Sequence, residues 1–503
     1  MVESLTARSH DDWVRRAKEL SPSGSALIEG ERVGAASGAT FPCLSARDGT
    51  LLTEVALGGG EDVERAVRSG RAAFEDGRWS HLRPRDRKRI LLRLAELMSE
   101  HAGELALIES LDCGKPIRDA VAVDVPGAIA CVRYFAEAAD KVFGEVAPMG
   151  PDALVTVTRE PLGVVGAVIP WNYPLLIASW KAAPALLTGN SLVLKPAEQA
   201  PLSSIRFAEL ALEAGMPPGV FNVVPGDGPL TGRALGLHPD VDKIAFTGST
   251  EVGKLFLRYA GESNMKRVSL ECGGKSPHIV LGDAPDLEAA AQAVTLSIFY
   301  NQGQTCSAGS RLIVEGSVKA ELMERVLAIG RSLEPGDPLD PATELGAMID
   351  AAQLARVLGY VEDARAEGAH VALGGEPARV GSGGSYMSPT VVDAITPAMR
   401  IAREEVFGPV LAVLEVEGPE AAVAVANDSV YGLVAGVWTR DIGTAHRMAN
   451  ALRAGTVWVN TFDMADVALP FGGFKQTGGG VDKSLHALDG YTQLKTTWID
   501  ISR

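Results

Sequence analysis

The segment KIAFTGSTEVGKL, from Lys243 to Leu255, has the pattern of a buried strand, a turn and the start of a helix. Apolar runs precede it in GVVGAVIPW, SLVLKPAE and VFNVVPG, and helices are predicted over 62–74, 85–107, 124–142 and 201–215. Strands and helices that alternate at this spacing predict an open α/β sheet with ligand-binding groups at the carboxyl ends of its strands. A second α/β region begins at Ser276, and alternating strands are predicted over 154–160 and 491–499.

Composition limits the classes of protein that this chain can be. Its 503 residues, 46% hydrophobic and 22% charged, are enough for two or three domains with large cores. The net charge of −16 gives no general attraction to nucleic acid or to anionic membranes. Five scattered cysteines indicate neither a disulfide framework nor a metal site. No apolar stretch is long enough to span a membrane and the first twenty residues lack a secretory core, so a cytoplasmic protein is expected.

The turn GSTEVGK, from Gly248 to Lys254, also has the spacing of a nucleotide-triphosphate P-loop. Leu255 stands where magnesium binding would need Ser or Thr, and Glu251 lies inside the loop. Ser249 can cap the following helix, whose free N–H groups favour a phosphate. The pyrophosphate of a dinucleotide needs no metal and fits better, and a P-loop NTPase is the alternative from a different class.

A single cysteine, Cys306, lies among small residues in NQGQTCSAGSR, residues 301–311. Small neighbours such as Gly303 and Gly309 would let a substrate approach the sulfur, which a nucleophilic thiol requires together with an environment that favours thiolate. A free cysteine packed in a turn as a small hydrophobe is the other interpretation. These residues alone do not decide between the two.

Two further motifs carry groups that a thiol nucleophile could use. Glu271 ends the apolar run of SLECGGKSP, where partial desolvation would raise its pKa and suit it to act as a general base. Asn172 follows a buried run in IPWNYP, and a side-chain amide fixed there can donate to an oxyanion. Either residue taken alone is as consistent with an ordinary turn.

Two other motifs suit the ribose and ring groups of a cofactor. Lys195 and Glu198, in VLKPAE, follow a buried strand, where a carboxylate would accept from ribose hydroxyls and repel a 2′-phosphate. Glu405 and Phe407, in REEVFGPV, could hold a second ribose and its ring. A surface ion pair and a charged turn are the simpler interpretations of these two motifs.

In order and spacing, IPWN, KPAE, FTGS, ECGGKSP, NQGQTC, EEVFGPV and PFGGFKQTG resemble the aldehyde dehydrogenase superfamily over nearly the whole chain. SNMKRVSLE, PGDPLDPAT and DKSLHALDGYTQLKTTWI are most similar to gamma-glutamyl-gamma-aminobutyraldehyde dehydrogenases and related aminoaldehyde oxidisers. The resemblance implies an α/β fold: a Rossmann-type dinucleotide-binding domain (1–142 and 163–273), an α/β catalytic domain (274–475) and a small β oligomerisation extension (143–162 and 476–503). Family members are dimers or tetramers, so a homodimer or homotetramer is expected.

The resemblance also assigns roles. Cys306 would attack an aldehyde and form a thioester, Asn172 would stabilise the oxyanion, and Glu271 would activate the water that hydrolyses the thioester. NAD is the expected cofactor, with NADP possible. The residues implied to bind it are Ile169, Trp171, Lys195, Glu198, Phe246, Gly248, Ser249, Gly273, Glu405 and Phe407.

The substrate is the property that the sequence indicates least directly. Tyr173, Trp180, Tyr300 and Phe471 match positions that line the family's aldehyde tunnel, and aromatic rings there would hold a cationic or aliphatic chain. Asp124 and Asp466 are candidates for binding a substrate ammonium, or are solvated surface acids. An ω-amino or acylamino aldehyde is therefore predicted. Broad-specificity aliphatic or aromatic aldehyde oxidation, betaine aldehyde oxidation, and a binding protein without turnover are the alternatives.

The sequence departs from the family pattern at three places. Cys272 stands where Leu is common and could be oxidised or cross-link to Cys306. Val481 replaces a common Arg, and Thr461, Phe462 and Asp463 replace an Asn-rich run.

Overall fold

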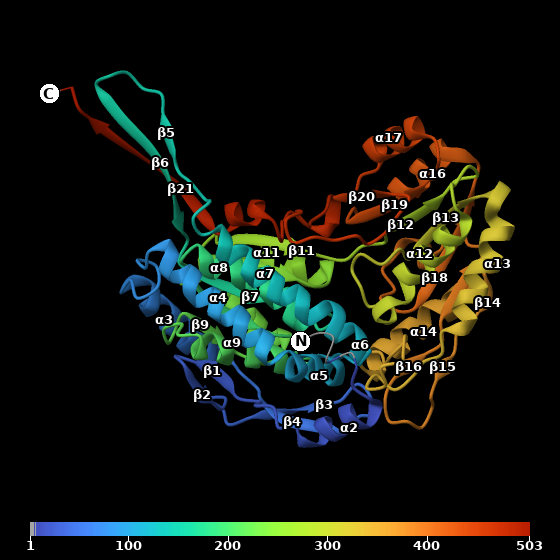
Figure 1. Cartoon of the computed structure of the whole chain (residues 1–503), viewed down its shortest axis with the longest axis horizontal. Coiled ribbons are helices and arrows are strands. Elements are labelled where there is room, and N and C mark those ends of the chain that lie inside the picture. The colour runs from blue at the N-terminus through green and yellow to red at the C-terminus, as the bar shows by residue number, and fades with distance from the viewer. Residues whose placement is uncertain (1–4, 6, 503) are drawn as a thin grey trace.

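Two seven-stranded sheets form the two lobes of the molecule (Figure 1). The computed structural model describes residues 5 and 7–502. The first sheet has the order β11-β10-β7-β8-β9-β1-β2, parallel from β11 to β9 and antiparallel at β1 and β2. Its strands are β1 (Ala26–Ile28), β2 (Glu31–Val33), β7 (Val164–Val168), β8 (Ser191–Lys195), β9 (Phe221–Val223), β10 (Lys243–Thr247) and β11 (Arg267–Glu271).

Helices cover both faces of this sheet because its central strands are apolar on both sides. Val164 and Val168 of β7 belong to the same core cluster as α3 and α11, whereas Val165 and Ala167 pack with α8 and α9 on the opposite face. The helices of this lobe are α2 (His10–Glu19), α3 (Gly60–Glu75), α4 (Pro84–Glu100), α5 (Ala102–Cys113), α6 (Ile117–Asp119), α7 (Val125–Ala138), α8 (Pro174–Leu187), α9 (Leu202–Glu213), α10 (Arg233–Leu237) and α11 (Thr250–Glu262).

The second sheet has the order β14-β17-β18-β13-β12-β19-β20, with only β14 antiparallel to its neighbour. Its strands are β12 (Pro277–Val280), β13 (Arg311–Glu315), β14 (His370–Leu373), β17 (Thr390–Asp393), β18 (Val410–Val416), β19 (Val434–Trp438) and β20 (Thr456–Val459). The helices are α12 (Leu287–Phe299), α13 (Gly316–Ser332), α14 (Ala351–Ala366), α15 (Arg400–Arg403), α16 (Gly418–Asn427) and α17 (Ile442–Ala451). Two hairpins complete the lobes, β3 (Thr40–Leu44) with β4 (Leu51–Ala56), and β15 (Pro377–Ala378) with β16 (Tyr386–Met387).

A three-stranded arm projects from the first lobe (Figure 1). It consists of β5 (Glu145–Ala147), β6 (Ala153–Pro161) and β21 (Thr492–Asp500), all antiparallel. β6 and β21 pair over their full lengths, from Ala153 opposite Asp500 to Pro161 opposite Thr492. Apolar side chains on the arm are open to solvent, among them Val146, Leu494 and Trp498.

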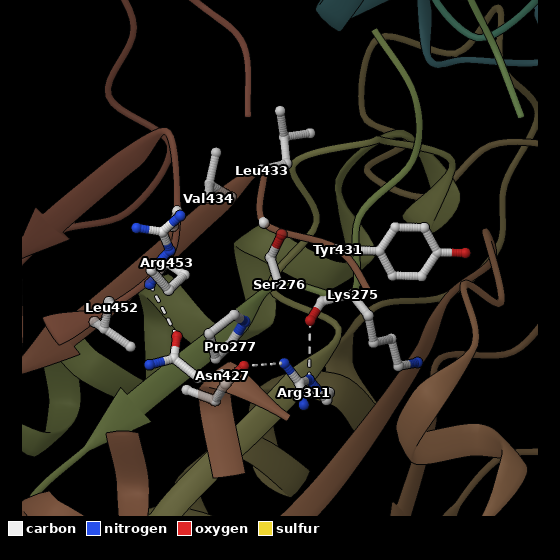
Figure 2. Close-up of a pocket in the computed structure, with 14 residues that line it drawn as sticks. Lys275, Ser276, Pro277, Arg311, Asn427, Tyr431, Leu433, Val434, Leu452 and Arg453 are labelled. Atoms are coloured by element: carbon white, nitrogen blue, oxygen red, sulfur yellow. Dashed lines mark hydrogen bonds between the residues drawn. The ribbon is translucent and has the colours of Figure 1, made fainter. Parts of the chain in front are cut away.

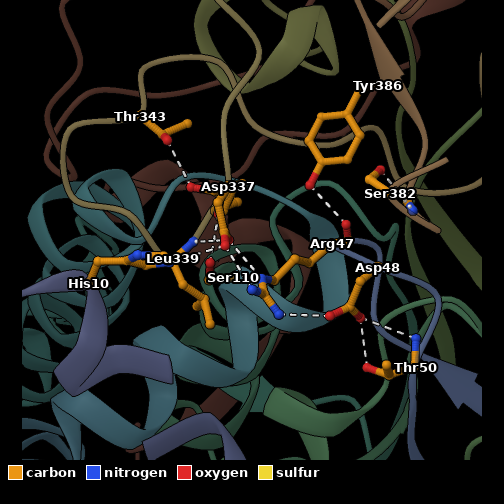
Figure 3. A network of polar contacts seen from close by, with 12 residues as sticks. His10, Arg47, Asp48, Thr50, Ser110, Asp337, Leu339, Thr343, Ser382 and Tyr386 are labelled. Carbon is orange, nitrogen blue, oxygen red and sulfur yellow. Dashed lines mark hydrogen bonds and ion pairs between the residues drawn. The ribbon is translucent and has the colours of Figure 1, made fainter. Parts of the chain in front are cut away.

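A polar network joins the amino-terminal segments to the second lobe (Figure 3). The Arg47 guanidinium donates to both carboxylate oxygens of Asp337, at 2.6 and 2.7 Å, and His10 Nε2 lies 3.1 Å from the same carboxylate. The Tyr386 hydroxyl donates to the main-chain oxygen of Arg47 at 2.8 Å. Arg47 holds the pKa of Asp337 down, at about 2, although burial opposes it. A bidentate pair of this kind fixes how the β3–β4 hairpin sits on the second lobe.

The predicted strands all appear, but two of the predicted helices differ. The helix expected over 85–107 is broken at His101, whose φ of −98° and ψ of 14° separate α4 from α5. The helix expected from Asp124 to Val142 starts after a π-helical turn over Ala120–Asp124 and ends at Ala138. Side-chain periodicity continues through such local breaks, which is why it did not reveal them. No helix among residues 5 and 7–502 could cross a membrane.

Candidate active site

A cleft with about 690 Å³ of empty space opens between the lobes. Adjacent parallel strands β7, β10 and β11 end at it, so the residues that follow them meet there. Its walls include nine residues that the sequence singled out: Trp171, Asn172, Gly248, Ser249, Glu271, Gly273, Cys306, Glu405 and Phe407. Gln353 and Arg356 of α14 also line it, and nothing in their local sequence had indicated this.

The loop before Cys306 is held in an unusual conformation. Asn301, Gln302 and Gly303 have φ of 47°, 57° and 68°, the left-handed region that side chains disfavour. The side-chain oxygen of Gln304 accepts from the N–H of Ile349 at 3.0 Å, which ties the loop to the second lobe. Such strain is maintained only when the surroundings fix the loop, so the position of the cysteine is fixed as well.

The small residues around Cys306 do not serve the purpose predicted for them. A Cβ on Gly303 would lie 2.0 Å from the main-chain oxygen of Gly408, and one on Gly309 would lie 2.6 Å from Ser297 Oγ. These glycines therefore make room for neighbouring parts of the protein. The expectation that they admit substrate was wrong.

Asn172 lies against the cysteine loop. Its side-chain amide donates to the main-chain oxygen of Gln304 at 2.9 Å, and the Asn301 amide donates to the same oxygen at 3.2 Å. An amide nitrogen carries two protons, so the Asn172 side chain keeps a second donor for a group bound at the cleft.

The Cys306 thiol is protonated in the free protein. Burial, together with the carboxyl groups of Glu405, Asp463 and Glu271, raises its pKa to about 12, against a hydrogen bond from the Ser307 N–H. A nucleophilic thiol requires surroundings that favour thiolate, and those around Cys306 in the free protein do not. Ionisation of the sulfur requires a nearby base or positive charge.

Glu271 is a buried carboxyl group on the same cleft. Its side chain is 4% exposed, and neither carboxylate oxygen has a hydrogen-bond partner within the described residues. Burial, with the nearby Asp482, raises its pKa well above the usual value, and Lys181 opposes this shift. Lys181 Nζ donates to Asp482 at 2.5 Å, and this buried ion pair, unrecognised in the sequence, sets the field at Glu271.

The far wall of the cleft is built around Glu405. The Gly274 N–H donates to its carboxylate at 3.1 Å, and a Cβ on Gly273 would lie 2.0 Å from that carboxylate and would displace it. Phe407 has a φ of 60° and its ring meets Trp171 edge-on, with centroids 5.3 Å apart. Gln353 Nε2 donates to the main-chain oxygen of Phe407 at 2.8 Å and holds this turn.

The residues predicted for the adenosine half lie at the same sheet edge. Lys195, the last residue of β8, is paired with Val168 of β7, and its Nζ donates to Glu198 at 3.1 Å. Ser249 caps α11 by accepting from the Val252 N–H at 3.3 Å. Ile169 and Phe246 do not present side chains to the cleft, because both are buried in core clusters, with the Phe246 ring directly beneath Gly248.

The lysine of the P-loop-like turn does not cover that turn. Lys254 Nζ donates to Gln476 Oε1 at 2.8 Å on the protein surface. A P-loop lysine would instead point at bound phosphates.

Figure 2 shows a smaller pocket beside the segment that follows Glu271. The Arg311 guanidinium donates there to the main-chain oxygens of Lys275, Val425 and Ala426. The N–H groups of Arg311 are thus occupied in joining strand β13 to the end of α16. Burial lowers the pKa of Lys275, whose ammonium has no partner in the described part of the chain, to about 7.

A group of aromatic side chains, here called the aromatic chamber, lies beside the Cys306 loop. The Tyr173 hydroxyl lies 2.9 Å from Thr305 Oγ1, and Phe471 shares an apolar cluster with Cys306. The rings of Trp180 and Phe471 are 5.5 Å apart. Tyr300 begins the turn that leads into the cysteine loop. The four aromatic residues predicted to line an aldehyde tunnel therefore lie around the cysteine loop.

The two acids proposed for a substrate ammonium have different surroundings. Asp124 is 0% exposed and forms an ion pair with Lys115. It is therefore not a solvated surface acid, and one of its carboxylate oxygens is already bonded to Lys115. Asp466 is exposed in the loop before Phe471 and accepts from the Ala468 N–H at 2.8 Å.

Two departures from the family pattern, Cys272 and Val481, have different surroundings. Cys272 points at α11, where a Cβ on Gly253 would be 2.9 Å from its Sγ, and burial raises its pKa to about 12. It is therefore an unreactive thiol in the free protein. Val481 is half-exposed, in the segment between the Gly478 turn and Asp482.

Comparison with known proteins agrees with this geometry. The model of the aldehyde dehydrogenase family matches residues 33–497. The chain belongs to the aldehyde dehydrogenase family. The enzyme is 49% identical to an aminoacetaldehyde dehydrogenase of Pseudomonas aeruginosa, over 98% of this chain and 99% of that protein. The family, the fold class and the enzymatic character predicted from the sequence are confirmed, and the P-loop NTPase alternative is wrong.

Two solved structures superpose closely on this aldehyde dehydrogenase. A gamma-glutamyl-gamma-aminobutyraldehyde dehydrogenase from Burkholderia cenocepacia has a TM-score of 0.97 and 53% identity, covering 98% of this chain and all (100%) of that one. The indole-3-acetaldehyde dehydrogenase AldA of P. syringae, solved with NAD+, has the same TM-score at 52% identity, again covering 98% and 100% of the two chains.

Proposed function

We propose that this aldehyde dehydrogenase oxidises an ω-amino or acylamino aldehyde to its carboxylic acid with NAD as cofactor. The observation that carries the proposal is the convergence of Cys306, Asn172 and Glu271 in a cleft shaped for a dinucleotide. Two similar proteins, an aminoacetaldehyde dehydrogenase and a gamma-glutamyl-gamma-aminobutyraldehyde dehydrogenase, support the substrate class. The similar indole-3-acetaldehyde dehydrogenase favours a broad or aromatic specificity as the second candidate.

The cleft residues fit a dinucleotide. Gly248 and Ser249 expose the amino end of α11 to a pyrophosphate, and Gly273 lets the Glu405 carboxylate lie against the main chain at the cleft. Glu405 and Phe407 would hold the nicotinamide ribose and ring, and Lys195 and Glu198 the adenosine ribose. Because Glu198 would repel a 2′-phosphate, NAD is expected to bind better than NADP.

The chain's own residues carry the covalent steps. Cys306 Sγ attacks the aldehyde carbon as its proton passes to a base, and the resulting oxyanion accepts from the free N–H of Asn172. A nicotinamide held by Glu405 and Phe407 would supply the hydride acceptor for that carbon. The thioester left on Cys306 is cleaved by water, from which Glu271 removes a proton; its unpartnered oxygens are free to accept one.

The proposed domains are a dinucleotide-binding unit (1–142 and 163–273), a catalytic unit (274–475) and an extension (143–162 and 476–503). Each seven-stranded sheet falls within one of the two larger units. Residues 476–490 pack beside the active site, where the main chain of Asp482 pairs with that of Phe471. The arm strand β21 begins only at Thr492. We also propose a reducing, cytoplasmic location, which agrees with all five cysteines, each within the described residues, being free.

An aldehyde panel read as NADH absorbance tests the function. We expect kcat/KM for 4-acetamidobutanal or 3-aminopropanal to exceed that for acetaldehyde by about tenfold or more, because the chamber offers contacts that a two-carbon aldehyde cannot reach. Equal or better kcat/KM for acetaldehyde would contradict the substrate class. Absence of turnover with every aldehyde would favour a binding protein. A separate titration with NAD and NADP compares the affinity of the enzyme for the two cofactors.

We further propose a homodimer or homotetramer assembled through the arm. Nine-residue strands with exposed apolar side chains and an open edge are prone to pair with another chain. Light scattering should give a mass of two or four times 52.8 kDa. Trp498→Asp should shift the population to smaller species, whereas Ile442→Asp, which changes an exposed apolar residue on α17, should not. A monomeric parent protein would refute the proposal.

A further inference from the structure

Lys483 is a buried lysine in the aromatic chamber beside Cys306. Its side chain is 6% exposed, and its Nζ lies 5.4 Å from the ring centroid of Trp180 and 5.2 Å from that of Phe471. Within residues 5 and 7–502 it has no hydrogen-bond or ion-pair partner. By contrast, the buried amines of Lys115 and Lys181 each have a carboxylate partner. Aromatic faces attract an ammonium but do not replace a lost hydrogen-bond acceptor.

The backbone fixes where this ammonium points. Lys483 has a φ of 60°, a left-handed conformation that is disfavoured for a residue with a side chain. Asp482 before it exchanges two main-chain hydrogen bonds with Phe471, both 2.8 Å, and Ser484 after it donates from its N–H to Val467 at 2.7 Å. The strain is held from both sides, so the lysine is directed between the two rings.

A carboxylate faces the same space. Asp463 accepts from the hydroxyl of Ser307, the residue after the nucleophile, at 3.1 Å. The side chain of Asp463 is open to solvent on one side. Burial by the protein around it raises its pKa to about 6, and Ser307 and Lys483 oppose this shift. Asp463 and Lys483 feel each other's charge without forming an ion pair.

We propose that Lys483 is a specificity-determining residue that donates a hydrogen bond to the amide carbonyl oxygen of an acylamino aldehyde. An amide offers a carbonyl to Lys483 and an N–H to an acid such as Asp463, so one group satisfies both. The inference rests on the proposed function and selects between its two substrate classes.

Substrates that end in an ammonium or a carboxylate suit the charges around Lys483 less well than an amide does. A free ω-ammonium would be attracted by Asp463 and Asp466 but repelled by Lys483, and unlike an amide it offers Lys483 no hydrogen-bond acceptor. A substrate carboxylate would pair with Lys483 but would also face Asp463 and Asp466, both of which act on Lys483 through their charges. A neutral amide avoids both penalties.

The test compares three aldehydes on one enzyme: 4-acetamidobutanal, heptanal of the same chain length, and 3-aminopropanal. In Lys483→Met we expect kcat/KM for 4-acetamidobutanal to fall roughly 10- to 100-fold, the loss of one hydrogen bond to a charged group. Heptanal should be unchanged or better, and 3-aminopropanal should improve. Lys483→Arg should keep most of the preference for the amide, because it keeps a cationic donor.

Matched controls separate this inference from the proposed function. Lys319→Met changes a lysine of α13 far from the chamber and should leave all three values unchanged. Heptanal turnover reports whether Lys483→Met folds, and Lys483→Gln provides a second uncharged variant. In Lys483→Met, an unchanged ratio of kcat/KM for 4-acetamidobutanal to kcat/KM for heptanal would overturn the role of Lys483. A higher kcat/KM of the parent enzyme for succinate semialdehyde than for 4-acetamidobutanal would do the same. Neither result would affect the proposed function. Absence of turnover with any aldehyde by the parent enzyme would overturn the proposed function itself.

Discussion

Cys306→Ala should abolish aldehyde oxidation, lowering kcat by at least about 10⁴-fold, because no other group can form the thioester. Cys272, the other thiol on the cleft, is turned toward α11 and its pKa is raised to about 12, so it cannot replace the nucleophile. The variant should still fold and bind NAD, because the loop is held by Gln304 and the Gly346–Ile349 segment rather than by the sulfur. NADH formation and cofactor titration measure the two properties separately.

A matched control for this variant is Cys43→Ala, which removes a buried thiol from strand β3 outside the cleft. It should lower stability slightly and leave kcat close to that of the parent enzyme. If Cys306→Ala kept activity within about tenfold of the parent, covalent catalysis through this residue would be wrong.

The sheets could be predicted because burial on both faces leaves continuous apolar runs, which β7, β8 and β10 show. Glu271 and Asn172 could be predicted because each directly follows such a run, and parallel strands end at one edge. The break between α4 and α5 at His101 leaves the apolar spacing intact, so the sequence did not mark it.

Groups that depend on tertiary approach were not predictable. The Lys181–Asp482 pair joins a helix to a loop near the other end of the chain, and no local pattern links them. Asp124 was expected at the surface or on a substrate because its partner Lys115 had not been recognised. The glycines of the cysteine loop were misread for a similar reason, because the groups they pack against belong to other segments: the main chain of Gly408 for Gly303 and Ser297 Oγ for Gly309.

Glu271→Gln should separate the two halves of the reaction. Attack by Cys306 and hydride loss need no activated water, so one equivalent of NADH per active site should form quickly. Hydrolysis of the thioester should then slow by about 10²- to 10⁴-fold, the usual contribution of a general base. Mass spectrometry of the quenched variant should find the acyl group on Cys306.

The pH dependence distinguishes a general base from a merely structural carboxyl. Burial raises the pKa of Glu271 above its ordinary value, so the parent enzyme should lose hydrolysis as the pH falls through that raised pKa and the carboxylate is protonated. Glu271→Gln has no group that titrates there, so its slow phase should lack this acid limb. Glu262→Gln, at the exposed end of α11, should behave like the parent. A variant that releases acid at the parent rate, or keeps the same acid limb, would require a different base.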